Sequence, residues 1–123
     1  MSAHKTKNLL FVFDKPPHSS LSAKEGLDAL LTASAFGQNV TLLLMGDGIH
    51  QILNNQNPAH LPTKNTASIF QALEMYGIEN VVTPAETLQH KGLTLADLSI
   101  TCEIIDNTQL ADLYVTQDQI LSF

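Results

Sequence analysis

The sequence predicts an α/β fold: a three-layer α/β/α sandwich around a mostly parallel five-stranded sheet, with residues 1–123 forming a single domain. Three observations predict it. Short apolar runs alternate along the chain with segments of helical periodicity, as they do in βαβ units. The first two runs are apolar at nearly every position, which is typical of strands buried on both faces. A chain of this length, 44% hydrophobic and 15% charged, can bury a core without disulfides or metals.

The first predicted strand covers residues 8–13, and a proline-containing turn ends it. The helix that follows has the capping-box spacing S-x-x-E at residues 22–25 and a largely apolar stripe over residues 27–34. Gly37 is placed to end this helix. Gly26 lies inside it, where glycine costs about 1 kcal/mol relative to alanine, so we expect close packing against a neighbouring backbone there.

The second predicted strand covers residues 40–45 and leads through Gly-Asp-Gly into one helical turn that carries Ile49, Ile52 and Leu53. Residues 54–65 are polar and contain two prolines, which predicts a surface loop that is available for contacts. The later elements are, in chain order, a helix that Gly77 ends, a strand at residues 81–82, a short helix at residues 84–91 that Gly92 closes, a strand at residues 99–105, a helix capped by Asn107 or Thr108, and a terminal strand at residues 119–123.

The Gly46-Asp47-Gly48 turn is the first candidate site, because ligands of parallel sheets bind at the carboxyl ends of the strands. It fits neither the dinucleotide fingerprint nor the P-loop, since no third glycine and no lysine follow at the required spacing. Asp47 has no second carboxylate close in the sequence with which to bind a metal. We therefore interpret the glycines as allowing an unusual backbone, and Asp47 as the cap of the turn that follows.

Histidines and serines give no stronger candidate. The five histidines are His4, His18, His50, His60 and His90. No two have the i, i+4 spacing of a helical metal site, and no C-x-x-C motif accompanies them. His18 is the best exception, because it follows the first strand at the carboxyl edge. No G-x-S-x-G elbow surrounds the serines beside it. We therefore expect no metal, no cofactor and no catalytic constellation.

Cys102 is the only cysteine, so an internal disulfide is impossible and nothing indicates an oxidising compartment. In the predicted fourth strand, Ile100, Cys102 and Ile104 alternate with polar residues and share one face. A thiol between two isoleucines is expected to be buried, with a raised pKa, and inert.

The charge balance excludes one class of function. Twelve acidic residues against six basic ones give a net charge of −6. A protein that binds nucleic acid alone draws its affinity from clustered lysine and arginine, so direct binding of nucleic acid is not expected. No apolar run reaches the length of a membrane span, and we expect a cytoplasmic protein.

Several motifs together resemble the TusC/DsrF family of sulfur-relay subunits. They are LFVF at residues 10–13, PH at 17–18, EGLDALL at 25–31, GDGIHQIL at 46–53, LQHKGL at 88–93 and ILSF at 120–123. The resemblance implies a DsrE/DsrF-like fold. It also implies TusB-like and TusD-like partners in a dimer of heterotrimers, which passes persulfide sulfur for 2-thiouridine formation at the tRNA wobble position. A DsrEFH-type subunit in sulfur oxidation is the related alternative.

Within this resemblance, the TusD/DsrE-type subunit carries sulfur on a cysteine in the loop after the third strand. Here that loop is VTPAE at residues 82–86, without a cysteine, which implies a non-catalytic subunit. Two further alternatives stay open: a flavodoxin-like small-molecule binder using the loops around His18 and Asp47, and a sulfurtransferase using Cys102. The candidate subunit contacts at the carboxyl edge are His18, Asp47, Ile49, His50 and Leu53.

Overall fold

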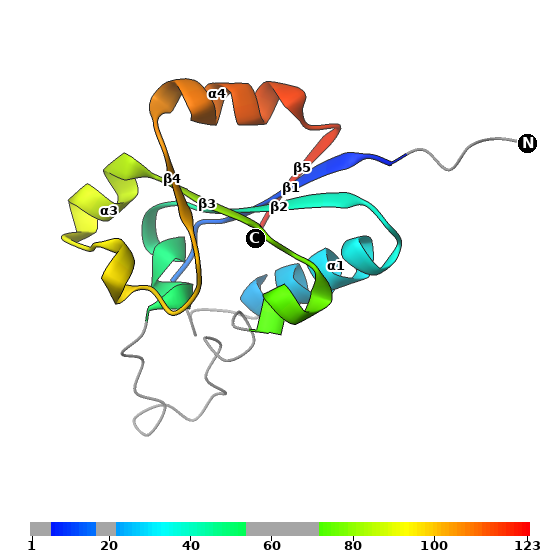
Figure 1. The fold of residues 1–123 in the computed structure, drawn as a ribbon, viewed down its shortest axis with the longest axis horizontal. Coiled ribbons are helices and arrows are strands. Elements are labelled where there is room, and N and C mark those ends of the chain that lie inside the picture. Colours follow the sequence, from blue (N-terminus) through cyan, green and yellow to red (C-terminus); the bar gives the residue numbers. More distant parts are fainter. Residues whose placement is uncertain (1–5, 17–21, 54–71) are drawn as a thin grey trace, which may run out of the picture.

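The computed structural model describes residues 6–16, 22–53 and 72–123 (Figure 1). Five strands form one sheet in the order β4-β3-β2-β1-β5, and all four pairings between neighbours are parallel. The strands are β1 (Asn8–Phe13), β2 (Asn39–Leu44), β3 (Asn80–Pro84), β4 (Glu103–Ile105) and β5 (Gln119–Ser122). The predicted α/β fold with a parallel five-stranded sheet is therefore confirmed.

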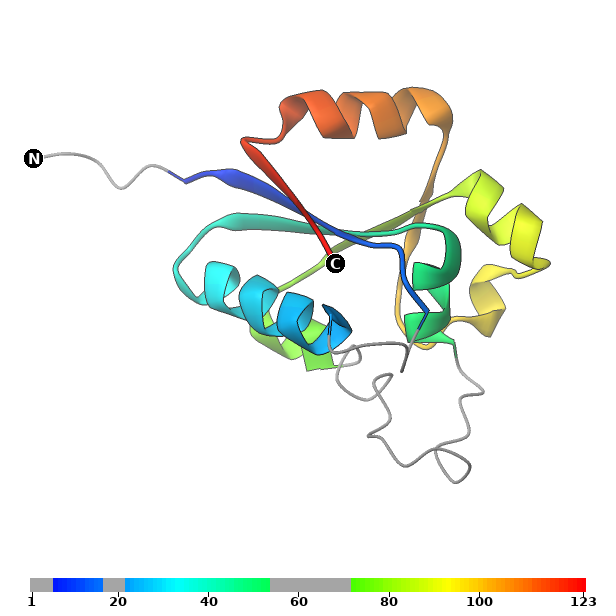
Figure 2. The same cartoon turned by 180° about the vertical axis from the view of Figure 1, so that it is seen from behind.

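Helices lie on both faces of the sheet, as Figures 1 and 2 show with α4 above it and α1 below it. The α-helices are α1 (Ser22–Ala35), α3 (Ala85–Lys91) and α4 (Asn107–Thr116). The short 3-10 helices are η1 (Gly46–Ile52), η3 (Ala72–Tyr76) and η4 (Leu95–Asp97).

Strand order explains how the helices divide between the two faces. From β1 to β4 the chain moves across the sheet in one direction, so right-handed crossovers bring these connections to one face. From β4 to β5 the chain crosses back in the opposite direction, which places α4 on the other face. Among the described elements, α4 is the only helix that covers that second face.

The two faces bury two clusters of unequal size, and alternate residues of β1 and β2 supply both. The larger cluster lies against α1 and includes Phe11, Phe13, Leu27, Leu30, Leu42 and Leu44. The smaller one lies under α4 and consists of Leu10, Val12, Leu43, Val82 and Ile105, with Leu110, Leu113 and Tyr114 packed against it. This division is why β1 and β2 are apolar at nearly every position.

Gly26 shows close packing, as predicted, but the contact is not with a backbone. A Cβ atom added to Gly26 would lie 2.7 Å from ring carbons of both Phe13 and Phe123. The Phe123 ring also stacks on Phe11, with ring centroids 6.1 Å apart. The C-terminal aromatic ring therefore closes the core beside α1, and glycine makes room for it.

The predicted fourth strand, residues 99–105, is wrong in extent, because β4 spans only Glu103–Ile105. The preceding residues pair with the end of η1 instead. The Ser99 N–H donates to the Ile52 carbonyl at 2.7 Å, and Leu98 forms an antiparallel bridge with Leu53. Cys102 consequently lies just before β4 rather than inside a strand.

The cap of α4 also differs from the prediction of Asn107 or Thr108. Asp106 is the N-cap, and its carboxylate accepts a hydrogen bond from the Gln109 N–H at 2.8 Å. The Gln109 side chain accepts in return from the Asp106 N–H at 2.9 Å. This reciprocal pair is a capping box, which stabilises a helix start by satisfying two otherwise free donors.

Glycines end three helices as predicted, with positive φ angles of 80° at Gly37, 81° at Gly77 and 66° at Gly92. The predicted loop over residues 54–65, and most of the helix expected after it, lie outside the described residues; η3 is the last turn before Gly77. None of the helices in the described ranges has the length and hydropathy of a membrane span.

Candidate functional site

Three chain segments meet at the carboxyl edge of the sheet. Asp14 and Lys15 follow β1, η1 follows β2, and α3 follows β3. Because parallel strands end at a common edge, these segments lie together, and α3 contacts η1 directly. The candidate ligand site predicted from the sequence lies at this edge.

Glycine is required at Gly46 and at Gly48 for two different structural reasons. Gly46 has a φ of +52°, which favours glycine. A Cβ atom on Gly48 would lie 1.8 Å from the Phe13 carbonyl oxygen, so no side chain fits there. The same oxygen accepts from the Met45 N–H at 3.1 Å. The interpretation of the glycines as backbone requirements is therefore confirmed: the turn packs η1 directly against the end of β1.

Asp47 does not cap this turn, so that part of the interpretation is wrong. The N-cap residue of η1 is Met45, and no side chain caps the helix. The Asp47 carboxylate instead accepts a hydrogen bond from the Lys91 ammonium at the end of α3, which also forms an ion pair with it. The hydrogen bond and charge of Lys91, with a smaller contribution from His50, hold the pKa of Asp47 below its usual range. An anion so stabilised is a poor general base.

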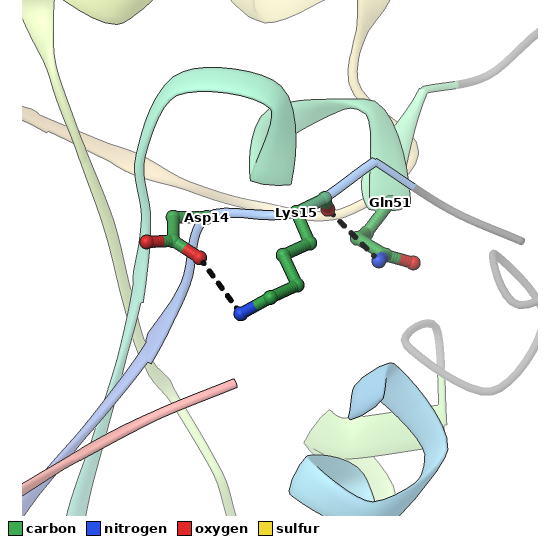
Figure 3. Close-up of polar contacts among 3 residues, drawn as sticks. All are labelled: Asp14, Lys15 and Gln51. Atoms are coloured by element: carbon green, nitrogen blue, oxygen red, sulfur yellow. Dashed lines mark hydrogen bonds and ion pairs between the residues drawn. The ribbon is translucent and has the colours of Figure 1, made fainter. Parts of the chain in front are cut away.

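Gln51 fixes the chain after β1, and the sequence analysis missed it. Its side chain is 1% exposed, and its Nε2 atom donates to the Lys15 carbonyl at 3.3 Å (Figure 3). The exposed side chains of Lys15 and Asp14 form an ion pair of 3.5 Å beside it. A glutamine in the apolar turn that carries Ile49 and Ile52 was the available signal, because a buried amide needs a partner.

The residues predicted as subunit contacts differ in how far they are buried. Ile49 is fully buried in the larger core cluster, so its side chain is not on the surface. Leu53 is half-buried and bridges to Leu98, His50 is half-buried, and Asp47 is exposed. For these three the role in subunit contact stays a prediction. His18 lies outside the described residues.

Cys102 is buried, with 6% of its surface exposed, and belongs to the larger core cluster. Burial, and to a lesser extent the neighbouring Glu103 carboxylate, raises the pKa of Cys102 to about 12. Its sulfur lies 3.9 Å from the Glu103 carbonyl oxygen. The predicted buried thiol with a raised pKa is confirmed, although its position in a strand is not.

β3 runs directly into α3. Thr83 is fully buried, and its hydroxyl donates to the Leu44 carbonyl at 2.8 Å. Pro84 then ends the strand and Ala85 begins α3. Within residues 6–16, 22–53 and 72–123, no group of three histidine, cysteine or carboxylate side chains is placed to bind a metal.

Large apolar side chains are exposed on a different part of the surface. Phe36 is 70% exposed just after α1, and Met75 and Tyr76 in η3 are 88% and 61% exposed. The two elements adjoin, because the Ser34 hydroxyl donates to the Tyr76 carbonyl at 3.3 Å. We refer to Phe36, Met75 and Tyr76 as the aromatic patch. Clustered exposed apolar side chains often mark a contact surface.

Comparisons with known proteins give matches over nearly the whole chain. The model of the DsrE/DsrF-like family matches residues 7–123. A protein from Vibrio vulnificus named "Protein TusC homolog" is 39% identical over 115 residues, which cover 94% of this chain and 98% of the relative. A Pseudomonas aeruginosa protein of the same name is 34% identical over 117 residues, covering 95% and 98%. The crystal structure of the ychN protein from E. coli has a similar fold, with a TM-score of 0.80 and 19% identity over 96% of this chain and all of that one.

Proposed function

Because this chain belongs to the DsrE/DsrF-like family, we propose that it is the TusC-type, non-catalytic subunit of a TusBCD-like sulfur-relay complex. It assembles with TusB-like and TusD-like subunits into a dimer of heterotrimers in the cytoplasm. The complex passes persulfide sulfur for 2-thiouridine formation at the tRNA wobble position. The observation that carries the proposal is the similarity to proteins named TusC homologues over 94% of the chain.

The state of Cys102 supports a role without sulfur chemistry. A persulfide carrier attacks as a thiolate, which requires an accessible sulfur with a low or ordinary pKa. Cys102 is buried and has a raised pKa. Pro84 and Ala85 lie here at the junction of β3 and α3, the region where the TusD-type carrier has its cysteine. The carrier thiol is therefore assigned to a partner subunit.

The aromatic patch supports a role in assembly. Its three side chains lie outside both core clusters, and each is more than half exposed. Aromatic residues and methionine are enriched at subunit interfaces. We assign the aromatic patch to contact with a partner subunit.

Co-expression with TusB-like and TusD-like chains tests assembly. The expected result is one hetero-oligomer in size-exclusion chromatography, and elution of this chain only as a monomer would contradict the proposal. Met75→Ser and Tyr76→Ser should each weaken the complex. Leu95→Ser changes an exposed apolar residue outside the aromatic patch and is the matched control.

Complementation of a deletion strain tests the function itself. Loss of this chain should lower 2-thiouridine in tRNA, measured by mass spectrometry of digested nucleosides, and the wild-type chain should restore it. Cys102→Ala should restore it as well. An unchanged 2-thiouridine level in the deletion strain would favour the sulfur-oxidation branch.

Binding of tRNA by the isolated chain is not expected. With a net charge of −6, few phosphates can be neutralised and little counterion release is gained. A filter-binding titration at two salt concentrations checks this. Tight, salt-sensitive binding at physiological ionic strength would show that the chain contacts tRNA directly.

A further inference from the structure

The sheet face under α4 is only partly covered by the described elements. Of the described connections, only the crossover from β4 to β5 runs over this face, for the topological reason given above (Figure 1). Beside α4 lies an open groove of about 360 Å³ over β2, β3 and β4. We refer to it as the α4 groove. Its floor includes Thr41, Val82 and Ile105, and its walls include Asn80, Glu103 and, on α4, Asp112.

The α4 groove combines an apolar floor with acidic walls. Val82 and Ile105 belong to the smaller core cluster and are nearly covered. Glu103 and Asp112 are exposed on opposite sides, and no lysine, arginine or histidine lines the groove. Val115, which is 80% exposed, lies one turn after Asp112 and extends the apolar surface at the α4 side.

We propose that the α4 groove binds a basic amphipathic helix of a partner subunit, placed beside α4 over β3 and β4. The inference rests on the proposed function. A second helix beside α4 would give this face the layer that three-layer folds normally have, because neighbouring helices pack 8–10 Å apart on a sheet. Its apolar side chains meet Val82 and Ile105, and its lysines or arginines meet Glu103 and Asp112.

The charges of this chain argue that the helix comes from another protein. Among the described helices, α1 carries one lysine, Lys24, and α3 carries Lys91, which already pairs with Asp47. The described helix α4 has no basic residue. None of these helices has a basic face that complements two carboxylates, so a second copy of the chain fits poorly. Opposite potentials across an interface favour the correct partner and speed its association.

The charge test compares two exposed helix carboxylates on opposite faces of the sheet. Asp112→Lys reverses a charge in the α4 groove, and Asp28→Lys makes the same change on α1. Each variant is titrated against the purified TusB-like and TusD-like subunits at two salt concentrations. Asp112→Lys should weaken binding roughly tenfold or more at low salt, because like charges across an interface repel. Asp28→Lys should bind as the wild type does.

A steric test is independent of charge. Asn80→Trp places a large ring in the α4 groove from an exposed position at the start of β3. It should weaken assembly, while circular dichroism and thermal unfolding show that the chain still folds. A photo-crosslinking amino acid at position 80 should label a partner peptide with at least two basic residues. The same group at position 28 should not label that peptide.

The outcomes separate this inference from the proposed function. If the wild-type chain assembles and both Asp112→Lys and Asn80→Trp assemble equally well, the α4 groove is not an interface and only the inference fails. If the wild-type chain does not bind the two subunits, the proposed function fails as well. If the groove variants instead disrupt a homo-oligomer of the isolated chain, the occupant is a second copy, which overturns the assignment to a partner helix.

Discussion

We expect the buried Cys102 thiol to react slowly, which can be tested by alkylation of the folded protein with iodoacetamide. A thiol with an ordinary pKa of about 8.5 is about 3% ionised at pH 7. With its pKa raised to about 12, Cys102 is ionised in only about one molecule in 100,000. Since the thiolate is the reactive form, the folded protein should react about three thousandfold more slowly than the unfolded chain.

Transient unfolding sets the lower limit of this rate. A 123-residue domain has a free energy of unfolding of at least about 6 kcal/mol, so about one molecule in 25,000 or fewer is open at any time. Alkylation through transient unfolding is therefore slower than the predicted alkylation of folded Cys102, so it does not mask the low reactivity of the folded protein. Mass spectrometry of samples quenched over hours, without urea and in about 8 M urea to unfold the chain, measures both rates.

The pH dependence gives a second readout with a defined sign. The raised pKa of Cys102 keeps the folded thiol protonated while the unfolded thiol ionises near pH 8.5. Alkylation of the folded protein should therefore rise about tenfold per pH unit from pH 8 to 10, where the unfolded rate levels off. Folding stability should fall over the same range, and Cys102→Ala should lack that loss. Labelling of folded Cys102 within tenfold of the unfolded rate at pH 7 would refute this reasoning.

Four further variants test the roles assigned to the turn and cap residues. Gly48→Ala should lower the free energy of unfolding, measured by urea titration, by about 3 kcal/mol or prevent folding, because the added Cβ would lie 1.8 Å from the Phe13 carbonyl oxygen. Gly46→Ala is the milder change, because the added Cβ would meet no atom and only the positive φ is unfavourable. It should lower the free energy of unfolding by about 1 kcal/mol. Asp47→Asn should lower stability slightly at pH 7. Its difference from the wild type should begin to shrink below the unfolded pKa of about 3.9, and it should be lost as the pH falls through the lower pKa of folded Asp47. Asp106→Ala should cost about 1 kcal/mol of unfolding free energy through the lost capping box, and an unchanged urea midpoint would exclude that role.

The sequence predicted the elements that depend on local patterns. The apolar runs of β1 and β2 identify strands buried on both faces, and the glycines at Gly37, Gly77 and Gly92 mark helix ends through their backbone alone. The predicted extent of β4 was wrong because the segment before it contacts the end of η1. These contacts, Leu98 with Leu53 and Ser99 with Ile52, join residues that are far apart in the sequence, so no local pattern records them. The strand order was likewise beyond a single sequence.

The same division holds at the candidate site. Burial of Cys102 could be predicted from its two isoleucine neighbours, and the raised pKa followed from burial. The role of Asp47 could not, because Lys91 lies 44 residues away and only the packing of α3 on η1 brings the two together. The contact between Gln51 and the Lys15 carbonyl is another long-range pairing, across 36 residues.

Several described residues at the carboxyl edge make contacts that hold the chain together. Gly48 brings η1 against the β1 carbonyl, Asp47 is neutralised by Lys91, and Gln51 donates to the backbone after β1. A catalytic site needs groups of matched pKa placed to meet a reacting atom. Among the described residues, the two groups with a shifted pKa are the Asp47 carboxylate at this edge, which is held ionised, and the buried Cys102 thiol away from it, which is held protonated. Under the proposed function, we therefore expect substitutions of exposed residues in the aromatic patch and the α4 groove to change assembly without changing the fold.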